Sequence, residues 1–80
     1  MKIQILGTGC PKCRTLESNA KEALAEKNLD AKIVKVSDIN EIMEFGVLMT
    51  PALAIDGDVK SSGKILTKNQ IIDILNNYNN

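Results

Sequence analysis

The sequence predicts an α/β protein with a four-stranded mixed sheet flanked by helices, in the order β-α-β-α-β-β-α. Short runs rich in Ile and Val alternate with longer runs whose apolar residues recur at helical spacing. The first two strand-like runs are separated by a long helical one, which requires a right-handed crossover and parallel pairing. The dipeptide Asp56-Gly57 between the last two strand-like runs is a strong hairpin signal, so those two strands run antiparallel.

The N-terminal segment reads as a strand followed by a long helix. Apolar and polar residues alternate over Lys2–Leu6, and the glycine-containing run 7–9 ends the strand. Pro11 suits the first helical position, where its missing N–H costs nothing, and the apolar residues that follow recur at helical spacing. This helix is expected to end near Asn28, since asparagine tolerates the left-handed conformation that closes a helix.

A second strand and a short helix are expected next. Ala31–Val36 is rich in β-branched residues, and either Ser37 or Asp38 can cap a short helix that Gly46 ends. The third strand is expected over Ala52–Ile55, directly before the hairpin turn.

The last strand and last helix have clear local signals. A fourth strand over Asp58–Ser61 follows the hairpin turn. Thr67 and Gln70 have the spacing of a capping box, and Leu66 and Ile71 occupy the two positions of a hydrophobic staple. The sequence therefore predicts a helix that begins directly after Thr67.

Length and composition limit the possible classes of protein. The chain has 80 residues, so residues 1–80 are expected to form a single domain. A hydrophobic content of 44% with zero net charge argues against disorder. Ten Lys and Arg are balanced by ten Asp and Glu, and aromatics are only 2%, so we expect no nucleic-acid partner. Histidine is absent, which excludes histidine catalysis and histidine metal ligation.

The same sequence indicates the compartment. No run approaches the roughly 18–20 apolar residues that a membrane span needs, and the N-terminal run is too short for a signal peptide. Two cysteines cannot form the disulfide framework of a small secreted domain. We therefore expect a cytoplasmic monomer with no membrane partner, in which a close cysteine pair is catalytic or metal-binding.

The motif Cys10-Pro11-Lys12-Cys13 carries the functional signal. Cys10 stands where a helix begins, so free backbone amides and the helix dipole favour a thiolate there, by roughly 0.3–1 kcal/mol. Lys12 and Arg14 add positive charge, and these effects should lower the pKa of Cys10. Cys13 lies one turn further on and is positioned to attack a mixed disulfide on Cys10. The spacing predicts Cys10 as the nucleophile and Cys13 as the resolving cysteine.

Three other interpretations compete with this one. Both cysteines can be ordinary buried residues, and the fold can serve only for protein interaction. The third alternative is a soft-metal site that binds or transfers copper or zinc. Without a third cysteine or a histidine a closed zinc site cannot form, but two-coordinate copper(I) binding is open. Small copper chaperones place a similar motif after their first strand. Their order is β-α-β-β-α-β, whereas this chain is expected to end on a helix.

A second motif lies before the third strand. Residues 45–52 read Phe-Gly-Val-Leu-Met-Thr-Pro-Ala, which resembles the thioredoxin pattern that precedes a cis-proline. Together with Cys10–Cys13 and the hairpin turn, this resembles the thioredoxin/glutaredoxin superfamily. More narrowly, nearly the whole chain is similar to the very small thioredoxin-like "redox-active disulfide" proteins of archaea and anaerobic bacteria.

The resemblance implies a minimal thioredoxin-like fold and a thiol–disulfide oxidoreductase. It implies a cis peptide between Thr50 and Pro51, with Pro51 packed against the disulfide and the Thr50 backbone paired with an extended substrate. Together with Thr50 and Pro51, the residues Pro11 and Lys12 are expected to bind the substrate. No cofactor is expected beyond the redox-active Cys10–Cys13 disulfide. The implied partners are a disulfide-containing protein and a reductase or low-molecular-weight thiol donor.

The chain departs from the family pattern in ways that leave roles open. Gly9 stands where thioredoxins usually have Trp, and the first two strands hold no acidic residue to assist proton transfer at the second cysteine. Lys12, Glu17 or water are the alternatives for that proton. The apolar run 47–49 before Pro51 predicts either an exposed rim for protein substrates or plain core packing.

Overall fold

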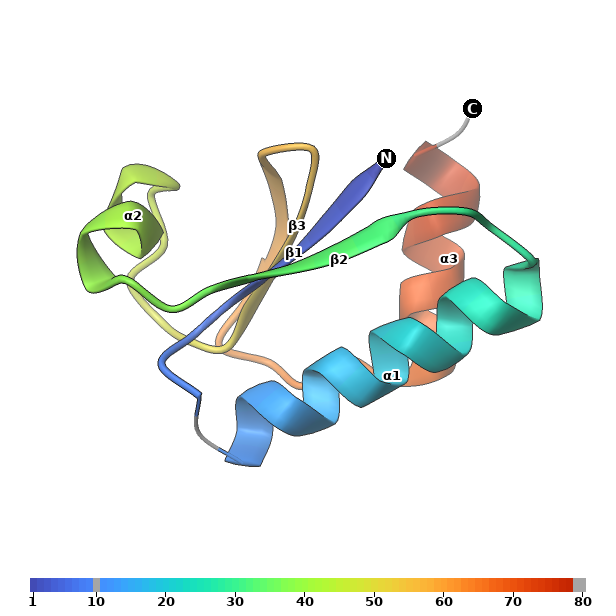
Figure 1. Cartoon of the computed structure of the whole chain (residues 1–80), viewed down its shortest axis with the longest axis horizontal. Helices are drawn as coiled ribbons and strands as arrows, with labels where there is room; N and C mark the ends of the chain where they lie inside the picture. Colours follow the sequence, from blue (N-terminus) through green and yellow to red (C-terminus); the bar gives the residue numbers. More distant parts are fainter. Residues whose placement is uncertain (10, 79–80) are drawn as a thin grey trace.

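The computed structural model describes residues 1–9 and 11–78, and its elements follow the predicted order (Figure 1). The strands and helices are β1 (Lys2–Leu6), α1 (Pro11–Lys27), β2 (Lys32–Val36), α2 (Ile39–Glu44), β3 (Ala52–Ile55), β4 (Asp58–Ser62) and α3 (Lys68–Tyr78).

The four strands form one mixed sheet in the order β2-β1-β3-β4. β1 is central and pairs parallel with β2 and antiparallel with β3, which places Ile3 between Ile33 and Ile55. β3 and β4 pair antiparallel through the predicted hairpin, where Asp56 and Gly57 both adopt positive φ, 50° and 88°. The predicted α/β fold class, with its mixed sheet, is confirmed.

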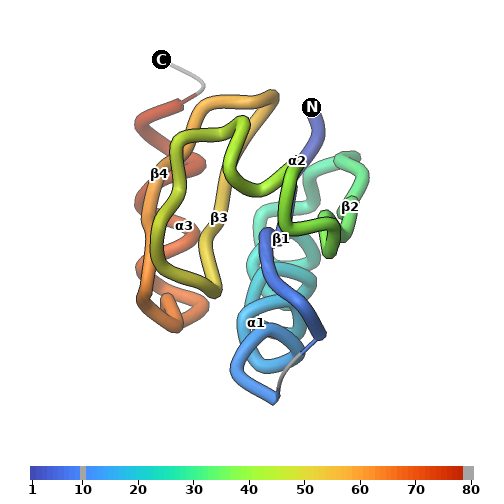
Figure 2. Tube along the Cα trace, turned by 90° about the vertical axis from the view of Figure 1, so that its left-hand side faces the viewer, coloured from blue at the N-terminus to red at the C-terminus, as the bar shows by residue number. Residues whose placement is uncertain are grey.

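Helices α1 and α3 cover one face of the sheet, and α2 lies beyond the end of β2, on the side of the molecule away from α3 (Figures 1 and 2). The larger core lies between the sheet and α1 and α3, and it includes Leu16, Ala20, Ile71 and Leu75 from the helices. A smaller core joins α2 to the other face of the sheet through Leu6, Val36, Ile42, Val47 and Ala52. The carboxyl end of β1 therefore lies between two packed layers.

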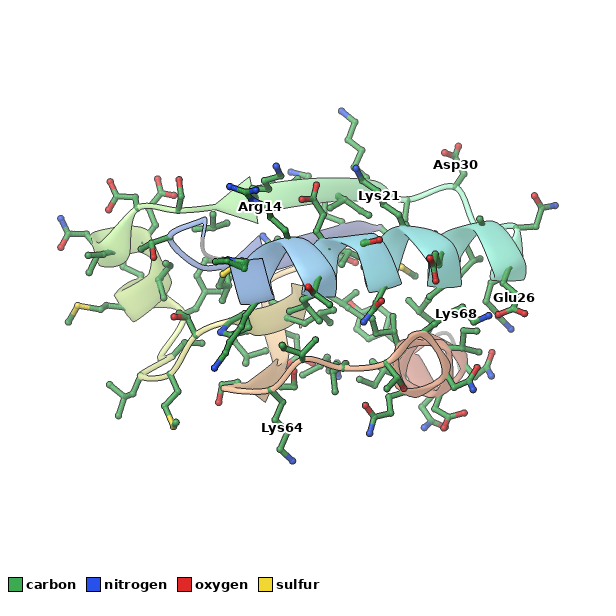
Figure 3. The ribbon with its side chains drawn as sticks, turned by 90° about the horizontal axis from the view of Figure 1, so that it is seen from below. Arg14, Lys21, Glu26, Asp30, Lys64 and Lys68 are labelled. Carbon is green, nitrogen blue, oxygen red and sulfur yellow. The ribbon has the colours of Figure 1, made fainter. Side chains whose placement is uncertain are left out.

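Polar contacts fix α1 against α3. The Asn19 amide donates to the Leu66 carbonyl at 2.8 Å, directly before α3. Lys68 and Glu26 form an exposed ion pair of 3.2 Å, and Figure 3 shows them facing each other between the two helices. Exposed pairs of this kind stabilise little, so apolar packing is the main contribution.

The predicted helix signals are confirmed. Asn28 closes α1 with a φ of 54°. Of the two predicted cap candidates, Ser37 and Asp38, the residue that caps α2 is Asp38, which accepts from the Asn40 amide at 2.7 Å and the Glu41 amide at 3.3 Å. The Thr67 hydroxyl accepts from the Gln70 amide at 3.2 Å, and the Gln70 side chain accepts from the Thr67 amide at 2.9 Å.

Two strand bounds differ from the prediction by one residue. β2 begins at Lys32 rather than Ala31, and β4 continues to Ser62 because Ser62 pairs with Ala52. Among the helices formed by residues 1–9 and 11–78, none is both long and apolar enough to cross a membrane.

A carboxylate ties the hairpin to the N-terminal strand. Asp56 Oδ1 accepts from the Lys2 amide at 2.7 Å, and Oδ2 accepts from the Tyr78 hydroxyl at 3.2 Å. The hydrogen bond from Lys2 lowers the pKa of Asp56 below its ordinary value, and the Tyr78 hydroxyl acts in the same direction. Because the pKa of Asp56 is lower in the folded protein than in the unfolded chain, the ionised carboxylate stabilises the fold at pH values above the pKa of the unfolded chain. This contribution is lost as the pH falls through the folded value.

Replacement of Asp56 by Asn tests this link, because Asn keeps an acceptor for the Lys2 amide and tolerates positive φ. The free energy of unfolding should fall less steeply for Asp56→Asn than for the parent between about pH 5 and pH 2. Denaturant titrations across this range measure the difference. Asp73→Asn is the control, since this exposed carboxylate of α3 has no hydrogen-bond partner among the described residues. Parallel pH profiles for the parent and Asp56→Asn would contradict the link.

Candidate active site

The sulfur of Cys13 meets the end of β1 at a glycine. Cys13 lies in the first turn of α1 and is 6% exposed. Gly7 follows β1, and its amide donates to the Val36 carbonyl at 2.9 Å. A Cβ atom added at Gly7 would overlap Cys13 Sγ, and it would lie 4.0 Å from the Cα of Pro51. Position 7 therefore has to be glycine, because the cysteine sulfur occupies the space that a side chain would need.

Pro51 lies beside the same face of Gly7 as the sulfur of Cys13, and hydrogen bonding fixes the segment that contains it. The Thr50–Pro51 peptide bond is cis, as the resemblance implied, and Pro51 is buried. The Pro51 carbonyl accepts from the Gly63 amide at 2.9 Å, and the Met49 side chain packs against Gly63. Thr50 is exposed, and its backbone N–H and C=O form no hydrogen bond with residues 1–9 or 11–78. An unpaired, exposed backbone segment thus lies beside the buried cysteine.

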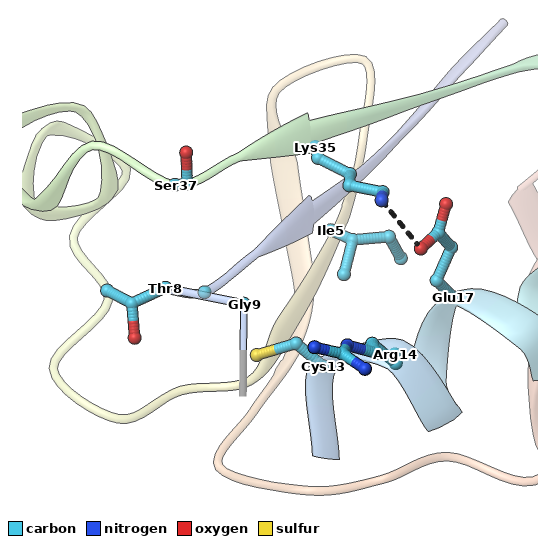
Figure 4. Close-up of a pocket in the computed structure, with 9 residues that line it drawn as sticks. Ile5, Thr8, Gly9, Cys13, Arg14, Glu17, Lys35 and Ser37 are labelled. Atoms are coloured by element: carbon cyan, nitrogen blue, oxygen red, sulfur yellow. Dashed lines mark ion pairs between the residues drawn. The ribbon is translucent and has the colours of Figure 1, made fainter. Parts of the chain in front are cut away.

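A polar pocket of about 380 Å³ lies on the β2 side of Cys13 (Figure 4). Glu17, one turn after Cys13, lines it with a side chain that is only 15% exposed. Its carboxylate pairs with Lys35 at 3.3 Å and with Lys21 at 3.5 Å. Arg14 lines the same pocket. The pocket thus combines a carboxylate that can accept a proton with cations that favour a thiolate.

An apolar pocket of about 340 Å³ lies on the other side of the loop that follows β1. We call it the α2 groove, and its lining residues are Thr8, Ile39, Ile42, Met43, Val47, Leu48 and Thr50. Leu48 is 93% exposed and Met49 64%, whereas Val47 is 4% exposed and packs in the smaller core. Core packing therefore holds for Val47, whereas Leu48 and Met49 are exposed as the alternative of a rim requires. Thr8 lines both pockets, so they open on either side of one short loop.

The structure brings together some of the sequence-predicted site residues. Cys13 Sγ and Pro51 both lie beside the position that a Cβ of Gly7 would occupy, and Thr50 directly precedes Pro51 in the chain. Pro11 and Lys12 are exposed in the first turn of α1 and line neither pocket. The nucleophile role predicted for Cys10, and its disulfide with Cys13, lie outside the described residues.

Gly7 is the site residue that sequence reasoning missed, because it read as one part of a turn. The available signal was a glycine at the end of a central strand, where it often marks the close approach of another group.

Within residues 1–9 and 11–78, no group of three or more His, Cys, Asp or Glu side chains is arranged to hold a metal ion.

Comparison with known proteins agrees with this geometry. The family model described as "Thioredoxin domain" matches residues 1–76. A protein named Thioredoxin from Methanothermobacter thermautotrophicus is 45% identical over 75 residues, covering 94% of this chain and 97% of the relative. The chain belongs to the thioredoxin domain family. A Thioredoxin from Methanocaldococcus jannaschii is 46% identical over 76 residues, covering 95% of this chain and 87% of that protein.

Membership of the thioredoxin domain family agrees with the observed fold. It makes the chain a thioredoxin-like disulfide oxidoreductase, a class of enzyme that acts on disulfides and is served by a reductase. Thioredoxins carry out this exchange with their own cysteines and use no external cofactor.

The contact between Gly7 and the Cys13 sulfur predicts a strong coupling between the two positions. Gly7→Ala should destabilise the parent by about 1–3 kcal/mol, because the new methyl group overlaps Cys13 Sγ. In a Cys13→Ala background the sulfur is gone, so the same change should cost less than half as much. Denaturant unfolding of the four proteins under reducing conditions completes this double-mutant cycle.

Thr8→Ala, at the exposed neighbouring position, is the matched control and should not depend on residue 13. Equal costs of Gly7→Ala in both backgrounds would show that the methyl group does not meet the sulfur.

Proposed function

We propose that this protein reduces disulfides with Cys10 as the nucleophile and Cys13 as the resolving cysteine. The observation that supports this best is the burial of Cys13 Sγ against Gly7 and near Pro51, directly beside an exposed, unpaired Thr50 backbone. A buried second thiol that lies next to a recognition segment suits attack on an intermediate rather than on free substrate.

The proposed reaction has two exchanges. The Cys10 thiolate attacks one sulfur of a substrate disulfide, which forms a mixed disulfide and releases the other sulfur as a thiolate. Cys13 then loses its proton and attacks the Cys10 sulfur. The Cys10–Cys13 disulfide forms, the second substrate thiolate leaves, and two electrons have passed to the substrate. A dithiol donor or a protein reductase returns the pair to its reduced state.

The groups around Cys13 support the second exchange. A thiol must be deprotonated to attack, and Glu17 and a water molecule in the polar pocket are the proposed acceptors. The cations of Arg14 and Lys35 in the same pocket favour the thiolate that results. Cys10 directly precedes α1, where the helix dipole and the nearby Lys12 favour its thiolate as well.

Substrate recognition is proposed to use the backbone of Thr50. Its free N–H and C=O can pair with an extended substrate segment, which adds a short strand beside the cysteines. Pro51 would pack against the reacting sulfurs, while Pro11 and Lys12 would contact the substrate from the first turn of α1. We further propose that the protein acts as a cytoplasmic monomer on disulfide-containing proteins.

Serine variants separate the two cysteine roles. Cys10→Ser should abolish reduction of insulin disulfides in the presence of dithiothreitol. Cys13→Ser should instead accumulate a covalent mixed disulfide, because the resolving thiol is missing. Mass spectrometry under non-reducing conditions detects this adduct, and Ser18→Ala, an exposed change on α1, is the control.

An adduct on Cys13 in the Cys10→Ser protein, with none in Cys13→Ser, would reverse the proposed roles. Absence of activity in the parent, combined with cysteine-dependent copper(I) binding, would favour the soft-metal alternative instead.

A further inference from the structure

Exposed apolar side chains are concentrated around the α2 groove. Among the described residues six large apolar side chains are exposed, and four of them lie between residues 39 and 49. They are Ile39, Met43, Leu48 and Met49, with exposed fractions from 61% to 93%. Ile39, Met43 and Leu48 line the groove together, and an exposed apolar cluster of this kind marks a place where another molecule docks. Methionine suits such a surface, because its flexible thioether adapts to different side chains.

The α2 groove is continuous with the proposed recognition segment. Thr50 lines the groove, and its unpaired backbone borders it. When a chain pairs with an exposed backbone, its alternate side chains point to the same side. A substrate paired with Thr50 can therefore direct a side chain two residues from its cysteine into the α2 groove. Apolar lining favours an aliphatic side chain there.

The charged residues beside the α2 groove indicate which residues flank the aliphatic side chain in the substrate. Between Lys35 and Lys60 the sequence has five acidic residues and no basic one. Three of the five, Asp38, Glu41 and Glu44, belong to α2 or its cap, and all three are exposed. None of these three forms an ion pair with a described residue, whereas Asp58 pairs with Lys60 at 2.8 Å.

Among the residues that the structure describes, no cation lines the α2 groove, and Arg14 and Lys35 line the polar pocket on the other side of the loop after β1. Figure 3 shows Lys21, Lys64 and Lys68 projecting from α1, the loop before α3 and α3, away from α2. The charge of the groove side is therefore negative, although the whole chain is neutral. Exposed charges act over about 8–10 Å at physiological salt, so the acidic residues of α2 can attract a cationic segment to the groove.

We propose that the α2 groove binds an aliphatic side chain of a positively charged, extended protein segment that carries the disulfide to be reduced. This inference rests on the proposed function and adds the chemistry of the preferred substrate. The apolar lining holds the aliphatic side chain, and the carboxylates of α2 attract Lys or Arg on either side of it.

Three synthetic peptides test the proposal. Each has one cysteine, joined by a disulfide to 2-mercaptoethanol. The first has leucine two residues to either side of the cysteine and flanking lysines. The second replaces the leucines by alanine, and the third replaces the lysines by glutamate. With excess dithiothreitol, kcat/KM should fall about tenfold from the first to the second peptide. It should also fall about three- to tenfold from the first to the third.

Two variants assign these losses to the groove. Leu48→Ser should remove most of the preference for leucine, and its side chain is too exposed for the change to unfold the protein. Glu41→Gln combined with Glu44→Gln should remove most of the preference for lysine. Salt at about 0.5 M should weaken the lysine preference and leave the leucine preference intact. Ile65→Ser and Asp73→Asn, an exposed apolar and an exposed acidic change outside the groove, are the matched controls.

Hydroxyethyl disulfide, a small uncharged substrate, separates failure of this proposal from failure of the proposed function. Equal kcat/KM for the three peptides, with hydroxyethyl disulfide still reduced, would overturn the groove proposal alone. Preferences that persist unchanged in Leu48→Ser and the double Gln variant would place recognition on another surface and also overturn it. No reduction of any substrate would overturn the proposed function itself.

Discussion

The contact between Gly7 and the sulfur of Cys13 is the constraint on which the site depends. β1 is an inner strand of the sheet, and the residue after it, Gly7, is approached by Cys13 of α1 and by Pro51. Any side chain at position 7 would separate these segments, because a single added carbon already overlaps the sulfur. Close packing at one glycine therefore brings the cysteine, the proline loop and the exposed backbone of Thr50 together. Interiors at native density leave little freedom to relax such a contact.

The two sides of the cysteine differ in chemistry. A polar pocket with Glu17, Lys35 and Arg14 lies beside Cys13, where protons and thiolates have to be handled. The apolar α2 groove borders Thr50, where a substrate chain would lie. The net charge of the chain is zero because an acidic segment around α2 is balanced by an excess of cations in the rest of the sequence. Recognition can thus use electrostatics locally, even though the total charge offers no attraction to any partner.

Sequence reasoning predicted the elements well because their signals are local. The hairpin dipeptide, the cap expected at Ser37 or Asp38 and the capping box at Thr67 each act within four residues. Each appears in the structure, with Asp38 as the cap. The cis peptide before Pro51 followed only from resemblance to a family, since proline at the start of a strand does not require it. The role of Gly7 was missed because its contact partner lies on another element. Contacts of this kind depend on how elements pack, which local patterns do not encode.

The most direct test is a crystal structure of the Cys13→Ser protein joined through Cys10 to the lysine-flanked leucine peptide. The central claim is that sulfur chemistry and recognition meet where Gly7 brings the cysteine and proline segments together. It predicts that the peptide backbone hydrogen-bonds to Thr50 beside Pro51, with a leucine in the α2 groove. A peptide that instead lies over the polar pocket of Arg14 and Lys35, without a contact to Thr50, would contradict the account.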